Sequence, residues 1–119
     1  MELKIIKITD IGGDNARIVI EVMSKTDIGR FMLFRVSKSE KGVSPNYPRQ
    51  VFLFPQKVVE KGDYVSVFFA YDDDKTFQNR RKTTTHAFHW GLKKEDVQVG
   101  DKFFLLHYDS WEVETVRED

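Results

Sequence analysis

The chain of 119 residues has no cysteine, only three prolines and no excess of either charge. Without cysteine it can form no disulfide, thiolate zinc site, iron–sulfur cluster or cysteine nucleophile. No apolar run approaches the ~18 residues of a membrane-spanning helix. The first ten residues include Lys4, Lys7 and Asp10 where a signal peptide would have an apolar core. We therefore expect a cytoplasmic chain with no membrane partner.

The balance of charge limits the partners further. The 19 Lys and Arg residues equal the 19 Asp and Glu residues, so the formal net charge is zero. A neutral total argues against a strongly electrostatic partner such as duplex DNA, although a local charged patch stays open. A chain of this length can bury about two thirds of its unfolded surface. We expect one domain over residues 1–119 that folds without disulfides.

Short apolar runs with a period of two dominate the sequence, and Gly, Asp, Asn and Pro clusters separate them. This pattern predicts an all-β fold. Residues 93–96 are the best candidate for a helix, and they are long enough only for a short connecting turn. The expected strands are 2–8, 16–22, 30–38, 51–54, 63–71, 84–90, 102–108 and 111–116.

Alternation assigns faces to two of these strands. Ile18, Ile20 and Val22 share one side of their strand, and Arg17 and Glu21 share the other, which predicts one wet face. The same pattern recurs in the strand 63–71. There Val65, Val67 and Phe69 would face the core, on the side opposite Tyr64 and Phe68.

The C-terminal strands differ from this pattern. Residues 102–108 are apolar on both faces, which predicts a central strand or one with a covered outer face. A tight reversal is expected directly after it. Trp111 and Val113 then alternate with Glu112 and Glu114, which predicts a strand near the edge of a sheet.

Turns and loops complete the pattern. The Gly-rich segment 12–15 is expected to close the first hairpin. The pairs Gly62-Asp63 and Gly100-Asp101 predict two equivalent turns, in which Gly supplies a positive φ and Asp bonds the local backbone. The polar connections 39–50 and 72–83 are long enough to carry function.

Eight short strands suit a β-sandwich or a small closed β-barrel. The segments 52–55 (FLFP) and 58–67 (VVEKGDYVSV) resemble a stretch of lamin-tail-like domains, and 99–106 (VGDKFFLL) with Trp90 and Trp111 resembles the ending of that family. The segments 21–24 (EVMS) and 28–33 (IGRFML) resemble two earlier elements of the family, so that the likeness covers nearly the whole chain. It implies an immunoglobulin-like β-sandwich of about eight antiparallel strands, used as a non-catalytic interaction module. It transfers no catalytic residue.

The resemblance and simple alternation disagree on one strand. The resemblance implies that Phe31, which stands where the family usually has Trp, is buried together with Leu33. Alternation alone favours Met32, Phe34 and Val36 as the buried set.

A basic stretch runs from residue 75 to residue 94 without a single carboxylate. One interpretation is a polyanion or single-strand nucleic-acid site, in which cations neutralise phosphates and an aromatic ring stacks on a base. The alternative is a solvated loop tip whose charges neutralise Asp72–Asp74, with Phe88 and Trp90 in the core. The candidate residues are the cations Lys75, Arg80, Arg81, Lys82, Lys93 and Lys94, with Phe77 as the ring free to stack.

Metal and catalytic sites are not expected. His86 and His89 are three residues apart on a strand, so they would point to opposite faces, with His86 half-buried and His89 exposed. Asp72–Asp74 lacks the ligand spacing of an EF-hand loop. The His, Asp and Ser of residues 107–110 lie across a predicted reversal, where their side chains diverge. We expect no catalytic residue, no metal and no cofactor.

Three functional hypotheses follow. The first is a non-catalytic module that binds a protein partner, or itself, with Tyr64 and Phe68 as contacts unless the loop 39–50 covers them. The second is polyanion or nucleic-acid binding through residues 75–94. A small hydrolase is the last alternative. Salt separates the first two, because binding through Arg and Lys weakens steeply as ionic strength rises.

Overall fold

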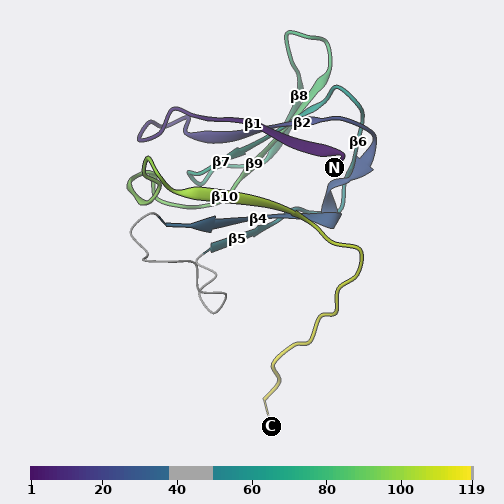
Figure 1. Ribbon diagram of the computed structural model, residues 1–119, viewed down its shortest axis with the longest axis vertical. Coiled ribbons are helices and arrows are strands. Elements are labelled where there is room, and N and C mark those ends of the chain that lie inside the picture. The colour runs from purple at the N-terminus through teal and green to yellow at the C-terminus, as the bar shows by residue number, and fades with distance from the viewer. Residues whose placement is uncertain (38–49, 119) are drawn as a thin grey trace.

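The computed structural model describes residues 1–37 and 50–118, and within them the chain is all-β (Figure 1). The predicted loop 39–50 lies outside the described residues except for Gln50. Two 3₁₀ turns, η1 (Ile28–Arg30) and η2 (Lys94–Asp96), are the helical elements of the described part. The strands are β1 (Leu3–Thr9), β2 (Arg17–Val22), β3 (Thr26–Asp27), β4 (Phe31–Val36), β5 (Gln50–Leu53), β6 (Val58–Val59), β7 (Tyr64–Phe68), β8 (Lys75–Gln78), β9 (Thr84–His89) and β10 (Lys102–His107).

The strands form three sheets. The largest has the order β1-β2-β7-β9-β8, the second has the order β10-β4-β5, and β3 pairs with β6. Figure 1 shows the five-stranded and three-stranded sheets as two layers. No sheet of the described residues closes on itself, so they do not form the closed barrel considered above. The pairs are antiparallel except β7 with β9, which run parallel, so the expectation of purely antiparallel strands was wrong.

The core of the five-stranded sheet follows the alternation of the sequence. Ile18 and Ile20 on β2 and Val65 and Val67 on β7 are fully buried. Their strands are neighbours in the sheet, and the paired positions put these side chains on the same face. Alternation predicted this face correctly because one side of each strand is entirely aliphatic, whereas the other side includes polar residues, Arg17 and Glu21 on β2 and Ser66 on β7.

The three-stranded sheet follows the resemblance. Phe31 and Leu33 on β4 are fully buried, whereas Met32 and Phe34 are only half-buried. The face favoured by alternation alone was therefore wrong for these two residues, although Val36 at the strand end is buried. Alternation fails here because β4 is apolar on both faces and pairs with a strand on each side.

Aromatic rings fill the space between the two layers. Phe69, which follows β7, stacks on Phe103 of β10 at a centroid distance of 5.3 Å. Trp90 meets the same Phe103 edge-on at 5.9 Å. Phe52 of β5 lies 6.4 Å from Phe88 of β9. Phe88 and Trp90 thus share the inner face, as expected, and the two sheets share one hydrophobic core.

The two Gly-Asp turns are equivalent, as predicted. Gly62 and Gly100 have φ values of +90° and +101°. In each turn the Asp side chain accepts a hydrogen bond of 3.0 Å from the backbone N–H three residues earlier. Each turn leads directly into a strand, β7 or β10.

Each of these Asp residues also holds a buried basic side chain from another strand. His86 Nε2 on β9 lies 3.0 Å from Asp63 Oδ2. Arg35 Nη2 on β4 donates to Asp101 Oδ2 at 2.7 Å, and the side chains of this pair are 9% and 2% exposed. The turns therefore connect strands of the same sheet from the inside of the fold.

The C-terminal part departs from the prediction. β10 lies at the end of its sheet, so it is not a central strand, and Phe104 and Leu106 on its outer face are each 40% exposed. The chain bends at residue 109 but does not reverse into a strand paired with β10. Residues 109–118 are exposed and outside any strand, with Trp111 55% and Val113 77% exposed, so the predicted strand 111–116 was wrong. Figure 1 shows this segment leading away from the two layers.

Among the described residues, no helix has the length and apolar character needed to cross a membrane.

Candidate binding face on the five-stranded sheet

The outer face of the five-stranded sheet carries the side chains that alternate with the core. Strand register arranges them in three rows that cross β2, β7 and β9, and two of these rows reach β8. Both predicted contact residues, Tyr64 and Phe68, lie in these rows. The rows are Arg17, Phe68, His89; Val19, Ser66, Ala87, Lys75; and Glu21, Tyr64, Thr85, Phe77.

The middle of this face is hollow. Ser66 and Ala87 are 6% and 1% exposed although they point outward, because their side chains are small and those of the flanking rows are large. The result is a hollow of about 400 Å³, which we call the sheet-face hollow. It is lined by Asn15, Arg17, Ser66, Phe68, Phe77 and Thr85.

Phe68 forms one wall of the sheet-face hollow and is held from two sides. The Arg17 guanidinium carbon lies 5.6 Å from the centre of the Phe68 ring. The His89 ring stacks on the other side at 5.1 Å. Asp74 fixes His89, accepting from its backbone N–H at 3.0 Å and lying 3.3 Å from its ring Nδ1. The His89 side chain is only 6% exposed, so the expectation of an exposed His89 was wrong.

Tyr64 lies under the tip of the hairpin that joins β8 and β9. The Arg81 guanidinium donates to the Tyr64 hydroxyl at 2.8 Å and lies 5.7 Å from the centre of its ring. Asn79 shapes this tip, because its Oδ1 accepts from the backbone N–H groups of Arg81 at 3.0 Å and Thr83 at 3.2 Å. The hairpin tip thus brings a cation onto the candidate face.

A smaller hollow of about 200 Å³ lies on the other side of Phe68. Its lining includes Lys75 and His89, and also the carboxylates of Asp14 and Asp72. The candidate face therefore mixes both signs of charge. A long polyanion laid across it would meet these two carboxylates as well as the cations.

The structure brings together only part of the predicted polyanion site. Lys75, Phe77 and Arg81 share the candidate face. Arg80 and Lys82 are exposed at the hairpin tip. Phe77 is 46% exposed, in line with the expectation of a ring free to stack.

The other predicted cations lie elsewhere. Lys93 is in the turn after β9, at the opposite end of that strand from the hairpin tip. At about 3.3 Å per residue, the six residues of β9 separate the two groups by roughly 20 Å. The side chain of Lys94 lies outside the described part. The basic stretch is thus spread over two ends of the sheet.

His86 belongs to the inner side of the sheet. It faces Asp63, whereas His89 faces outward, so the two imidazoles lie on opposite faces as expected. Burial raises the pKa of Asp63, but hydrogen bonds from His86 and from two backbone N–H groups outweigh it and hold the pKa below 3.8. The described residues contain no group of three or more His, Asp and Glu side chains placed to hold a metal ion.

Four of the residues that line the sheet-face hollow were not predicted from the sequence. Asn15, Arg17, Ser66 and Thr85 were not among the predicted site residues. Arg17 did stand on the predicted wet face of its strand. Predicting that Arg17 lies beside Phe68 requires knowledge of the strand order, which is set by contacts between distant parts of the chain.

Comparison with protein-family models, curated protein sequences and solved structures gives no match. The resemblance to lamin-tail-like domains therefore stays a prediction.

Proposed function

We propose that this chain is a non-catalytic module that binds a protein partner through the sheet-face hollow. The observation that carries the proposal is the combination of two aromatic walls, Phe68 and Phe77, with a floor of small side chains and the Arg17 cation. A partner segment with an aromatic side chain next to a carboxylate has the matching chemistry.

The fit follows from the parts of the hollow. A flat ring inserted against Phe68 and Phe77 gains contact area and favourable ring geometry. A neighbouring carboxylate on the partner can pair with Arg17, whose guanidinium is already placed over Phe68. Aromatic and Arg side chains around a small pocket are the residue types that contribute most to binding at protein interfaces.

We propose further that the two layered sheets form an immunoglobulin-like sandwich of the lamin-tail-like kind. The rings packed between the layers support this proposal. The burial of Phe31 and Leu33, which the resemblance implied, supports it as well. The parallel pairing of β7 with β9 is a feature that such a sandwich must accommodate.

Nucleic-acid binding is the second candidate. Lys75, Phe77 and Arg81 gather on the same face as Arg17, which would suit a short single strand. Asp14 and Asp72 beside Phe68 oppose it, because they would repel successive phosphates. A protein segment with one carboxylate avoids that repulsion, so we rank it first.

A random peptide library selected on the immobilised chain tests the protein-binding proposal. We expect enrichment of peptides with an aromatic residue next to Asp or Glu. Ser66→Phe, which fills the floor of the sheet-face hollow, should weaken binding of the enriched peptides at least about tenfold, measured by calorimetry.

The matched control is Val99→Phe, which adds the same ring at a position that is 77% exposed and outside the sheet-face hollow. It should leave peptide binding unchanged. Equal binding by Ser66→Phe and wild type would contradict the proposal, as would a selection without enrichment. Thermal unfolding of both variants checks that they fold.

Salt distinguishes the two candidates. Anisotropy of a labelled single strand at low salt measures nucleic-acid binding, and the triple change Arg80→Ala, Arg81→Ala and Lys82→Ala should abolish it if the second candidate is right. Strand binding that falls steeply with salt and is lost in the triple variant would reverse our ranking.

A further inference from the structure

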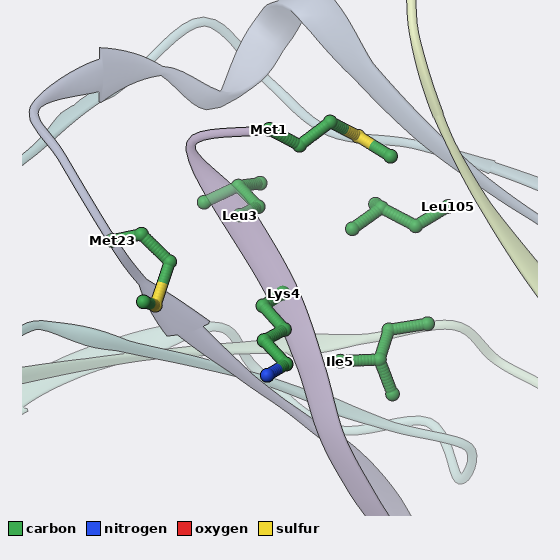
Figure 2. Close-up of a pocket in the computed structure, with 6 residues that line it drawn as sticks. All are labelled: Met1, Leu3, Lys4, Ile5, Met23 and Leu105. Carbon is green, nitrogen blue, oxygen red and sulfur yellow. The ribbon is translucent and has the colours of Figure 1, made fainter.

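An apolar hollow lies where the free edges of the two main sheets meet. β1 is the end strand of the five-stranded sheet and β10 is the end strand of the three-stranded sheet in the part of the chain that the structure describes. The hollow has a volume of about 440 Å³. In Figure 2, Met1 and Ile5 extend toward Leu105, whereas Lys4 points away from them. The lining consists of Met1, Leu3, Lys4, Ile5, Met23 and Leu105.

The outer face of β1 carries two lysines with an unusual spacing. Lys4 and Lys7 are three residues apart in the sequence, an odd separation that would put them on opposite faces of a regular strand. A shift of register between Ile5 and Lys7 changes this, because the partners of the two lysines on β2 are Glu21 and Val19, two positions apart. Both lysines therefore stand on one face at the spacing of alternate strand residues.

The C-terminal segment 109–118 has the complementary pattern. Trp111 and Val113 alternate with Glu112 and Glu114, which is typical of a strand with one buried face. The two glutamates are two positions apart, as Lys4 and Lys7 are on the ladder. The described residues of this segment are all exposed. Trp111 meets Tyr108 edge-on at a centroid distance of 5.3 Å and still remains 55% exposed, so the apolar side chains of the segment have no core of their own.

We propose that residues 109–118 of one copy dock as an added strand on the free edge of β1 in a second copy. Trp111 occupies the apolar hollow. Glu112 and Glu114 stand beside Lys4 and Lys7 as cross-strand pairs. The inference concerns a different surface from the sheet-face hollow and does not depend on the proposed function.

A second copy is the occupant that the geometry favours. The segment leads away from its own sheets after Tyr108, whose backbone N–H and hydroxyl both bond to the η1 turn, to Arg30 and Gly29 respectively. Its own hollow is therefore not reached without a reversal. Lysines on a free edge also disfavour pairing of β1 with another β1 while accepting an acidic strand. Reciprocal docking of two tails would close a twofold dimer.

Sedimentation of the full chain over a concentration series tests the proposal. We expect a reversible dimer in the wild type. Lys4→Glu with Lys7→Glu should raise the dissociation constant about tenfold or more, and Glu112→Lys with Glu114→Lys should do the same. An equimolar mixture of the two variants should form dimers again, since each tail then meets a groove of opposite charge.

A charge-matched control uses Lys61→Glu with Arg80→Glu, two exposed positions that do not line the apolar hollow. This variant should dimerise as the wild type does. In a mixture with either of the other variants it can form only one of the two docking contacts, so it should restore assembly less than those two variants restore each other. Trp111→Ala should weaken the dimer without lowering thermal stability in dilute solution. Ser66→Phe, which fills the sheet-face hollow and not the apolar hollow, should leave the dimer intact. The dimer test is therefore separate from the peptide-binding test.

Three results would overturn the proposal. The first is a wild type that stays monomeric across the concentration series. This includes the case in which Trp111 fluorescence shows that the tail is buried within its own copy. The second is a dimer that Trp111→Ala and the two charge reversals leave unchanged. The third is a failure of the two opposite variants to assemble when mixed.

Discussion

Asp63 joins a turn to a neighbouring strand through three hydrogen bonds to one carboxylate. Its oxygens accept from the backbone N–H groups of Glu60 at 3.0 Å and Thr84 at 3.2 Å, and Oδ2 lies 3.0 Å from His86 Nε2. These contacts stabilise the charged form and depress the pKa of Asp63 against the opposing effect of burial. The charged carboxylate is therefore a source of folding stability.

This source of stability depends on pH in a defined direction. Because the pKa of Asp63 is lower in the folded than in the unfolded chain, its contribution is full above the unfolded value and is lost as the pH falls below 3.8. We expect Asp63→Asn to lower the free energy of unfolding at neutral pH by about 1–3 kcal/mol. The difference from wild type should shrink as the solution becomes more acidic. Urea denaturation at a series of pH values measures both effects.

Asp73→Asn provides the comparison, since Asp73 is an exposed carboxylate in the loop before β8. Its stability should follow the wild type at every pH. A stability difference between Asp63→Asn and wild type that stays constant down to strongly acidic pH would show that the charge of Asp63 is not the cause.

At the scale of single residues, the sequence predicted the two Gly-Asp turns but not the distant side chains that each Asp binds. The Gly-Asp pairs 62–63 and 100–101 have local signals, and both turns formed as expected. His86 is 23 residues from Asp63, and Arg35 is 66 residues from Asp101. No local pattern links residues so far apart, because the link arises only when the strands pack.

At the scale of elements, apolar alternation predicted the long strands and missed the weak ones. β3 and β6 have two residues each, too few to show a period. β8 consists of four exposed residues, so no buried side marks it. Residues 111–116 show the opposite failure, with strong alternation and no strand. Alternation indicates that a segment can bury one face. To form a strand, the segment also needs a neighbouring strand with which it can pair.

The β8–β9 hairpin depends on Asn79. Its Nδ2 donates to the hydroxyls of Thr83 at 2.9 Å and Thr85 at 3.0 Å, and its Oδ1 accepts from the backbone of the tip. We expect Asn79→Ala to loosen β8, because β8 pairs with β9 alone in the described residues and is exposed. A lost hydrogen bond of about 1 kcal/mol should speed amide exchange in β8 roughly fivefold.

Hydrogen exchange followed by NMR measures this change residue by residue. Arg80→Ala, at an exposed position of the same tip, should leave the exchange rates of β8 unchanged. Unaltered rates in Asn79→Ala would mean that strand pairing alone holds the hairpin.

At the scale of the whole molecule, the sequence found residues of the candidate site but not their grouping. Tyr64, Phe68, Phe77 and Arg81 were assigned to two separate hypothetical sites, and strand register places them on one face. The same register sends Lys93 to the other end of β9. Which residues share a site is thus decided by strand order, which a single sequence does not display.

The aromatic rings packed between the two sheets predict that the sheets unfold together. The prediction of one domain implies a single cooperative transition, because both sheets contribute to the same core. Phe69 and Phe103 stack across the layers at 5.3 Å, so a double-mutant cycle with alanine should give a coupling energy of about 0.5–1.5 kcal/mol. Urea denaturation followed by Trp fluorescence and by circular dichroism should give coincident curves, since Trp90 contacts Phe103 from the five-stranded side. Two separate transitions, or additive effects of the two alanines, would mean that the sheets are stabilised independently of each other.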